Sequence, residues 1–589
     1  MMILKTLSLS ALCAAALCCS AAQAGAIYPI DRATILAGSK FDVKVEFDAA
    51  SEQKEIRATL NGVPLAQAVG RDPEFIGKEN GNAGSSLQLR DVVLDKPGRY
   101  KLAATDGKQA MEVEWEVFGT GPRRARNVIL FIGDGMTIAN RTAARVLSRG
   151  ITEGKYRGML SFDDMPSTAL IGTSGVDSLI TDSANAMSAY TTGHKSSVNA
   201  LGVYASRATN NMAHPKVETI TELVKRKTKM GVGIVSDAEL QDATPAGMVA
   251  HTRRRADKEY IAEQLFMSRA DVVLGGGMAW FQPQGVKGSK RRDDNDIVAL
   301  FRGDGYAVAD DKQGLAAAAG KPGTRKLFGA FHPDNMDGSL DRLFLKKGTV
   351  AQYPNQPDLT EMTKAAIDVL SRNPDGFVLM VEAALIDKFN HPLDWERAAF
   401  DTIMLSNAVQ VAKDFAAKRN DTLIIVVPDH THSGSVAGVI DDARKGTELR
   451  DKVGTYAEAG YPNYPAPNAA GYPEKIDVSR RMAFFYGAYP DHYETMRPKL
   501  DGPFEPVLKN DKGQYVANPK YKQQFEDAAH VDGPLPHSAD SGVHTADDAL
   551  LNAMGPGADK FRGFMDNTEV FRRMVEALGL GGAGALNKK

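Results

Sequence analysis

The stretch Asn127-Val128-Ile129-Leu130-Phe131-Ile132-Gly133-Asp134-Gly135 decides the fold. No polar residue interrupts Val128 to Ile132, which is typical of a strand buried on both faces. Similar apolar runs follow along the chain: Val232 to Val235, Val272 to Leu274, Phe377 to Val381, and Leu423 to Val427. Helical patterns separate them: Val217 to Arg226, Ile261 to Met267, Met362 to Leu370, and Ala398 to Ala417. This alternation predicts an α/β fold, a doubly wound and mostly parallel sheet with helices on both faces.

A different pattern precedes this region. From Gly25 to about Gly119 apolar and polar residues alternate, as in Phe41 to Phe47 and Met111 to Val117, and Asn61-Gly62 marks a turn. These features predict half-buried antiparallel strands joined by hairpins. We interpret residues 25–120 as a small all-β immunoglobulin-like sandwich with its own core, separable from a larger α/β region over residues 121–589. A stretch rich in Tyr, Pro and Gly at about 433–536 predicts an insertion over the mouth of the site.

Charge and targeting signals restrict the class of protein. The chain has 589 residues with 71 basic and 73 acidic side chains and no long charged block, which argues against nucleic acid as a dedicated partner. The apolar stretch Leu7 to Cys19, followed by Ala22-Gln23-Ala24, predicts a signal peptide over residues 1–24. An uncleaved anchor or a lipid anchor at Cys18 or Cys19 is disfavoured. We therefore expect a periplasmic or secreted protein whose mature chain has no membrane span and no cysteine.

Acidic residues follow the ends of the predicted strands. Asp134 and Glu382 each come directly after one, Asp242 follows Val235 by a few residues, and Asp429-His430 follows Leu423 to Val427. Because carboxyl ends of parallel strands meet at one edge of a sheet, these ligands should converge there. Any one alone would more readily be a helix cap, but the convergence indicates a metal site.

Histidines extend this set. Asp387 and His391 are four residues apart and share one face of a predicted helix, and a mixture of carboxylate and imidazole suits zinc. His544 is non-specific by itself, and His432 is a bystander or a supporting neighbour.

The run Thr181-Asp182-Ser183-Ala184 places a serine at the predicted start of a helix. Free N–H groups and the positive end of the helix dipole favour an alkoxide and a bound phosphate there, so Ser183 is a candidate nucleophile. The alternative is an ordinary helix cap.

Together these motifs resemble the alkaline phosphatases. The matching blocks occur in the family's order over about Asn127 to Leu580, without the insertion: Ile132 to Met136, Thr181 to Ala184, Asp242 to Ala246, Val381-Glu382 with Ile386 to Lys388 and His391, Asp429-His430, His544-Thr545, Gly555 to Gly557, and Met565 to Thr568. The resemblance implies an alkaline phosphatase-like fold and a secreted, metal-dependent phosphomonoesterase that works through a phosphoserine.

Each site residue has a role that the resemblance implies. One Zn²⁺ would be held by Asp387, His391 and His544. A second would be held by Asp134, Asp429 and His430, with Ser183 joining it as the nucleophile. One Mg²⁺ would take Asp134, Thr244 and Glu382, Arg255 would clamp the phosphate, and Asp242 and Lys388 would support the magnesium site and the phosphate through water. Relatives are often homodimers. Pro428 and Asn185 depart from the family pattern, which leaves the fine tuning of the second zinc and of the nucleophile helix open.

Other functions fit the residues less well. A sulfatase would need a Cys or Ser in a Cys/Ser-x-Pro-x-Arg context, whereas Ala-Asn-Ala follows Ser183. A phosphodiesterase commonly uses Thr as nucleophile and lacks the magnesium ligands. A metal-stabilised binding protein would not need Ser183 and Arg255 together with every metal ligand. We therefore expect small phosphate monoesters as substrates.

Overall fold

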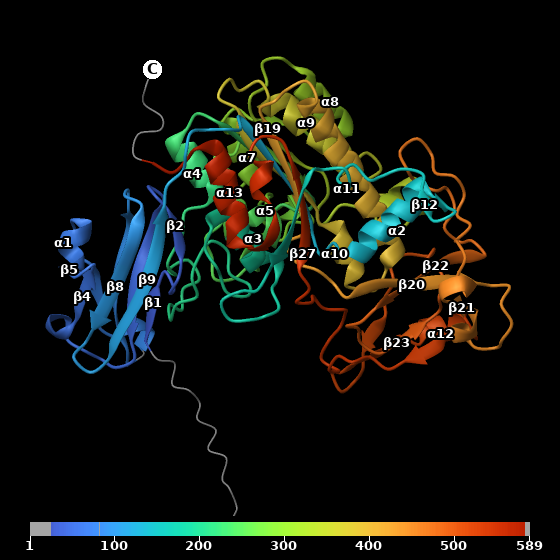
Figure 1. Cartoon of the computed structure of the whole chain (residues 1–589), viewed down its shortest axis with the longest axis horizontal. Coiled ribbons are helices and arrows are strands. Elements are labelled where there is room, and N and C mark those ends of the chain that lie inside the picture. The colour runs from blue at the N-terminus through green and yellow to red at the C-terminus, as the bar shows by residue number, and fades with distance from the viewer. Residues whose placement is uncertain (1–24, 82, 583–589) are drawn as a thin grey trace, which may run out of the picture.

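A central sheet organises the protein (Figure 1). The structure, a computed structural model, describes residues 25–81 and 83–582, so the predicted signal peptide lies outside the described residues. The sheet has ten strands in the order β16 (Ala307–Val308), β17 (Leu327–Ala330), β15 (Val272–Gly276), β14 (Gly231–Glu239), β18 (Phe377–Ala383), β10 (Asn127–Gly133), β19 (Thr422–Val427), β27 (Ala549–Met554), β13 (Ser167–Gly172) and β28 (Gly563–Asp566). Its pairs are parallel except those of β27, which runs antiparallel to β19 and β13. The predicted mostly parallel sheet is confirmed.

Strand β10 shows why the apolar run has no polar alternation. Val128, Leu130 and Ile132 pack into the core on one face of the sheet, while Ile129 and Phe131 pack into the core on the other. Residues of α3 (Ser183–Thr192), α4 (Ile220–Lys227), α5 (Ala243–Ala246), α6 (Lys258–Met267), α7 (Ile297–Gly303) and α13 (Thr568–Leu578) contribute to the first core. Residues of α2 (Ile138–Arg149), α8 (Lys312–Gly320), α9 (Leu359–Leu370), α10 (Leu385–Asn390) and α11 (Trp395–Ala416) contribute to the second. Both faces are therefore covered, as the doubly wound prediction requires.

The N-terminal region forms two small sheets on a separate core. One is antiparallel and contains β1 (Ala26–Tyr28), β3 (Lys40–Phe47), β7 (Ser85–Val93) and β6 (Glu74–Ile76). The other contains β2 (Thr34–Leu36), β9 (Ala110–Phe118), β8 (Gly98–Thr105), β4 (Arg57–Leu60) and β5 (Val63–Pro64), with α1 (Leu65–Val69) after β5. The Asn61-Gly62 turn joins β4 to β5 as predicted. An immunoglobulin-like relationship stays a prediction.

Strand β3 departs from the half-buried pattern. Its polar residues Asp42, Lys44 and Glu46 are all buried. They are covered by residues 203–218 of the α/β region, a segment that we call the strap. The main-chain N–H of Lys216 donates to a carboxylate oxygen of Asp42, and the main-chain N–H of Arg207 donates to a carboxylate oxygen of Glu46. The alternating pattern correctly predicted a strand, but the polar face of this strand contacts the strap and not solvent.

The strap also contributes residues to the core of the N-terminal sheets. Tyr204 and Val217 belong to the sandwich core, and Val217 pairs with Phe41 of β3. For this reason α4 begins at Ile220 and not at the predicted Val217, with Thr219 as its capping residue. The core of residues 25–120 is therefore completed by the strap.

The segment predicted as an insertion lies at the end of the molecule opposite the sandwich (Figure 1). It contains short sheets and one α-helix: β20 (Gly434–Asp441), β21 (Val453–Gly454), β22 (Arg480–Tyr486), β23 (His492–Glu494), β24 (Val507–Lys509), β25 (Tyr515–Ala517), α12 (Lys520–Gln524) and β26 (Ala529–Val531). A further hairpin, β11 (Ile151–Thr152) with β12 (Lys155–Tyr156), follows α2. No helix within residues 25–81 and 83–582 is long and apolar enough to cross a membrane.

Candidate active site

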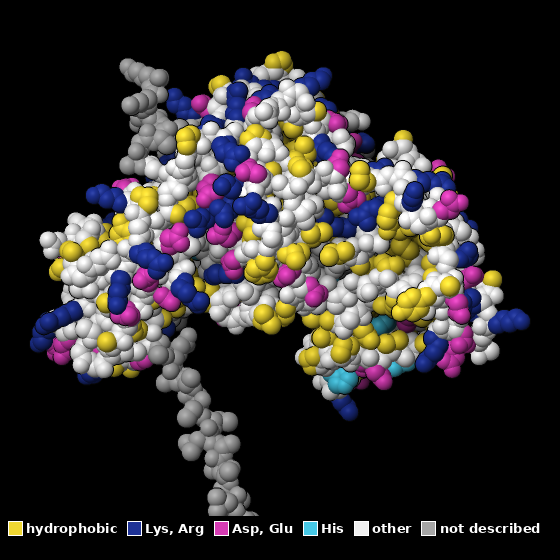
Figure 2. Space-filling model, in the orientation of Figure 1, with side chains coloured by type: hydrophobic (Ala, Val, Ile, Leu, Met, Phe, Trp, Pro, Cys, Tyr) yellow, Lys and Arg dark blue, Asp and Glu magenta, His cyan; other side chains and the backbone are white. Residues whose placement is uncertain are grey.

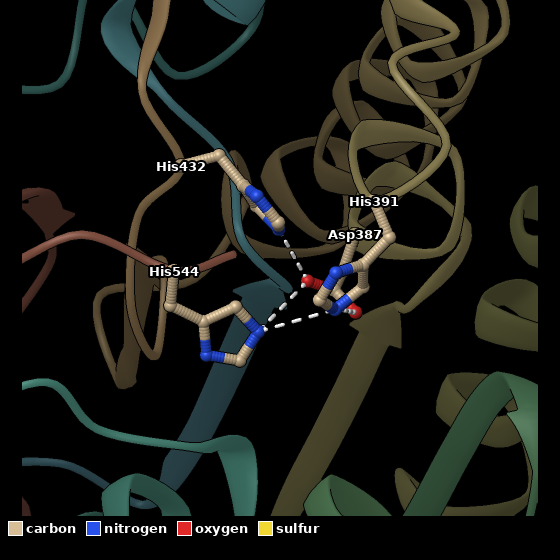
Figure 3. A group of neighbouring side chains, drawn as sticks. All are labelled: Asp387, His391, His432 and His544. Atoms are coloured by element: carbon tan, nitrogen blue, oxygen red, sulfur yellow. Dashed lines mark hydrogen bonds and ion pairs between the residues drawn. The ribbon is translucent and has the colours of Figure 1, made fainter. Parts of the chain in front are cut away.

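Three histidines surround one buried carboxylate beyond the end of β18 (Figure 3). Oδ2 of Asp387, on α10, lies 3.4 Å from Nε2 of His391. Oδ1 of the same residue lies 3.5 Å from Nε2 of His544 and 2.7 Å from Nε2 of His432. Hydrogen bonds at the Nδ1 atoms orient two of these rings. Nδ1 of His391 lies 2.7 Å from the main-chain carbonyl oxygen of Gly542, and Nδ1 of His544 lies 2.8 Å from that of Thr181. Asp387, His391 and His544 can thus offer one oxygen and two nitrogens to a cation.

A second group lies at the ends of β10 and β19. Nε2 of His430 lies 3.1 Å from Oγ of Ser183, 3.2 Å from Oδ1 of Asp134 and 3.4 Å from Oδ2 of Asp429. All four side chains are buried. Asp134, Asp429 and His430 therefore converge with Ser183, although the chain separates them widely.

The orientation of the His430 ring excludes a serine–histidine–aspartate relay in this group. In a serine–histidine–aspartate relay the serine and the carboxylate contact different nitrogens of the imidazole. Here Nε2 faces the serine and both carboxylates, while Nδ1 is buried and has no hydrogen-bond partner among the described residues. Side chains that aim at one point are typical of ligands around a cation.

Three buried oxygens that accept no hydrogen bond from the described residues support the same conclusion. Oδ1 of Asp134, Oδ2 of Asp429 and Oγ1 of Thr244 are buried and accept no hydrogen bond within the described part of the chain. Burial, and then the charge of Asp387, raises the pKa of Asp134 to about 7. Burial and then Asp134 raise the pKa of Glu382 well above its ordinary value. Carboxylates this close repel one another unless a cation neutralises them, so the donor set fits metal ions.

Ser183 is the first residue of α3. Asp182 caps this helix, because Oδ1 of Asp182 accepts the Asn185 N–H at 3.0 Å and Oδ1 of Asn185 accepts the Asp182 N–H at 2.9 Å. Asn185, which departs from the family pattern, is therefore half of a capping box. The serine hydroxyl thus sits at the positive end of the helix dipole.

A cationic group lies beside this helix end. Nη2 of Arg255 donates to Oδ1 of Asp242 at 2.7 Å, and Nη1 lies 3.6 Å from Oδ2 of Asp182. Nζ of Lys388 lies 3.1 Å from the other oxygen of Asp242. Burial opposes ionisation of Asp242, but the charges of Lys388 and then Arg255 hold its pKa well below the ordinary value. Asp242 therefore joins two cations that can bind a phosphate.

The sequence comparison agrees with this geometry. The profile of the alkaline phosphatase family matches residues 125–580. The chain belongs to the alkaline phosphatase family. It is therefore a phosphoric monoester hydrolase, and family membership implies phosphate monoesters as substrates and metal ions as cofactors.

Several curated alkaline phosphatases are similar to this one. That of Escherichia fergusonii is 35% identical over 413 residues, which cover 63% of this chain and 82% of the relative. Alkaline phosphatase H of Pseudomonas aeruginosa is 34% identical over 415 residues, covering 64% and 84%. Alkaline phosphatase 4 of Bacillus subtilis is 28% identical over 455 residues, covering 75% and 87%.

Solved alkaline phosphatases share the fold. The enzyme of Thermus thermophilus has a TM-score of 0.57 and 24% identity, and the match covers 78% of this chain and 93% of that one. The enzyme of the Antarctic bacterium TAB5 has a TM-score of 0.53 and 20% identity, covering 78% and 99%. A mutant of the TAB5 enzyme was solved with Mg bound in its M3 site.

Proposed function

We propose that this alkaline phosphatase uses Ser183 as its nucleophile, two Zn²⁺ and one Mg²⁺ as cofactors, and Arg255 as its phosphate clamp. The proposal rests above all on the convergence of Nε2 of His430 with Oγ of Ser183 and with one buried oxygen each of Asp134 and Asp429. Among the described residues, neither of these two carboxylate oxygens accepts a hydrogen bond. Asp387, His391 and His544 would hold one zinc, Asp134, Asp429 and His430 the other, and Asp134, Thr244 and Glu382 the magnesium.

The chain's own residues would bind and orient the substrate. Arg255 would donate two N–H groups to phosphate oxygens, held in place by Asp242, while Lys388 would act on the phosphate through water. This positions the phosphorus in front of Ser183 at the positive end of α3.

The reaction would have two displacements. Oγ of Ser183 forms a bond to phosphorus and loses its proton, while the bond to the leaving oxygen breaks and the alcohol departs with a proton. Water then attacks the phosphoserine, which breaks the Oγ–phosphorus bond, returns the proton to Ser183 and releases inorganic phosphate. Bound metal ions supply the positive charge that lowers the pKa of the nucleophiles and neutralises the leaving oxygen.

Trapping of the phosphoenzyme tests the nucleophile. Wild type incubated with a labelled aryl phosphate and quenched in acid should carry label, and Ser183→Ala should carry none and turn over far more slowly. Ser178→Ala, a serine five positions earlier, should behave as wild type. Equal labelling of Ser183→Ala would overturn the assignment. Wild-type rates on an aryl sulfate and an aryl phosphodiester should lie well below that on the monoester.

We also propose the wider organisation of the protein. It would be exported, with residues 1–24 as the signal, residues 25–120 as the sandwich, and residues 121–589 as the catalytic region with an insertion at about 433–536. A homodimer is proposed by analogy with the family, and light scattering of the purified protein tests it. No dedicated nucleic-acid partner is proposed, because Lys and Arg side chains are interspersed with Asp and Glu on the face drawn in Figure 2.

A further inference from the structure

A single exposed residue, Asn199, links the side chain that caps the nucleophile helix to the main chain of Arg255. The N–H of Asn199 donates to Oδ2 of Asp182 at 3.0 Å, and its carbonyl accepts the N–H of Arg255 at 2.9 Å. Oδ1 of the same Asp182 caps α3 through the Asn185 N–H. The peptide groups of Asn199 therefore lie between the start of α3 and the backbone from which the Arg255 guanidinium extends.

The conformation of Asn199 makes both contacts possible. Its φ angle is 66°, in the left-handed region that β-branched and most other side chains avoid and that Asn tolerates. Within the described residues, all the hydrogen bonds of Asn199 use its main chain, and its side chain is exposed. The site thus depends on the backbone geometry at this position and not on the carboxamide.

Neighbouring bonds hold the turn against the clamp segment. Leu201 and Thr252 form an antiparallel bridge, and Nη1 of Arg253 donates to the Val198 carbonyl at 3.0 Å. Asp242 fixes only the outer end of the Arg255 side chain. The inner end is set by the backbone at Asn199, so both ends are needed to aim the guanidinium.

We propose that Asn199 is a positioning residue for phosphate binding, and that its left-handed main chain sets the separation between Ser183 and the backbone of Arg255. This inference rests on the proposed role of Arg255. It predicts that a residue which resists the left-handed conformation moves the guanidinium away from the phosphate.

Substitutions at this exposed position test the idea without disturbing the core. In the holoenzyme, with metal content checked, Asn199→Val should weaken competitive inhibition by inorganic phosphate about tenfold and lower kcat/KM for an aryl phosphate about tenfold. Asn199→Gly keeps the conformation and should stay within about twofold of wild type. Glu153→Val is the matched control, because Glu153 is exposed, has a φ of 51° and lies in the β11–β12 turn. It should leave both constants unchanged.

A double-mutant cycle shows whether Asn199 acts through Arg255. In the Arg255→Ala background, Asn199→Val should have little further effect on phosphate inhibition. If Arg255→Ala weakens phosphate and Asn199→Val does not, the role of Asn199 is overturned while that of Arg255 stands. If Arg255→Ala itself leaves phosphate inhibition unchanged, the proposed clamp fails. If Asn199→Val does not show a cooperative thermal melt, Asn199→Ala is measured in its place, and its phosphate inhibition is judged in the same way.

Discussion

Nε2 of His432 lies 2.7 Å from Oδ1 of Asp387, the carboxylate that also faces His391 and His544. His432 is buried, and burial lowers its pKa to about 3, so the ring is neutral and can donate its Nε2 hydrogen to Asp387. A fixed carboxylate binds a cation with less loss of freedom, and neighbours of this kind orient metal ligands. Of the two readings left open by the sequence, bystander or supporting neighbour, the contact favours the second.

Replacement of His432 should therefore weaken metal binding. We expect His432→Ala to lower the affinity of the Asp387 site for zinc by about 10- to 100-fold. Zinc content after dialysis against graded chelator concentrations measures this. His537→Ala, which removes an exposed histidine outside the candidate metal groups, should retain zinc like wild type. Identical retention in both variants would return His432 to the status of a bystander.

Removal of metal should abolish activity, and recovery should need two kinds of ion. The histidine-containing sets suit zinc, whereas Asp134, Thr244 and Glu382 offer only oxygens and suit magnesium. After chelation, zinc alone should restore part of the aryl phosphatase rate, and zinc with magnesium all of it. Metal analysis should then find about two zinc and one magnesium per chain. Full activity with one bound ion of any kind would contradict the assignment.

The sequence predicted the catalytic fold well, because its main signals are local. An uninterrupted apolar run such as Val128 to Ile132 is typical of a strand covered on both faces, and a carboxylate directly after such a strand lies at the edge of the sheet. The four-residue spacing of Asp387 and His391 likewise fixes their shared face once the segment is helical. Such inferences need no knowledge of distant contacts.

Features that depend on distant contacts were beyond the sequence. The alternation in β3 predicts a polar face that is exposed to solvent. Lys44 is nevertheless buried, with Nζ 2.9 Å from Oε1 of Glu46, because the strap, more than 150 residues later in the chain, covers this face. Asn199 carried no sequence signal, since its contacts use only the main chain. Asn185 could have been recognised as a capping partner from its place three residues after Asp182.

Glu396 should make stability depend on pH. Burial, and then the charge of Asp394, raises the pKa of Glu396 from 4.5 to about 8. The folded state thus holds a proton that the unfolded state releases above pH 4.5. The resulting stabilisation is complete below pH 4.5 and is lost as the pH rises through about 8, at up to about 1.4 kcal/mol per pH unit.

Urea unfolding of wild type and Glu396→Gln at pH 5, 6, 7 and 8 measures this contribution. The neutral amide cannot titrate, so the free energy of unfolding of wild type should fall relative to that of the variant across this range. Glu153→Gln, at an exposed site, should follow wild type. Parallel curves for wild type and Glu396→Gln would mean that Glu396 titrates normally.

The strap should tie the stability of the sandwich to that of the catalytic region. Val217 is buried in the sandwich core and pairs with Phe41 although it belongs to the catalytic part of the chain. Val217→Asp places a charge in this core, and we expect it to lower the free energy of unfolding by about 3 kcal/mol. Val63→Asp makes the same change at an exposed position of β5 and should shift stability by less than about 0.5 kcal/mol. Denaturant unfolding of the two full-length variants measures this difference. If Val217→Asp is as stable as Val63→Asp, the contact of the strap with the sandwich core contributes little to the stability of the protein, and the sandwich is separable as its sequence suggested.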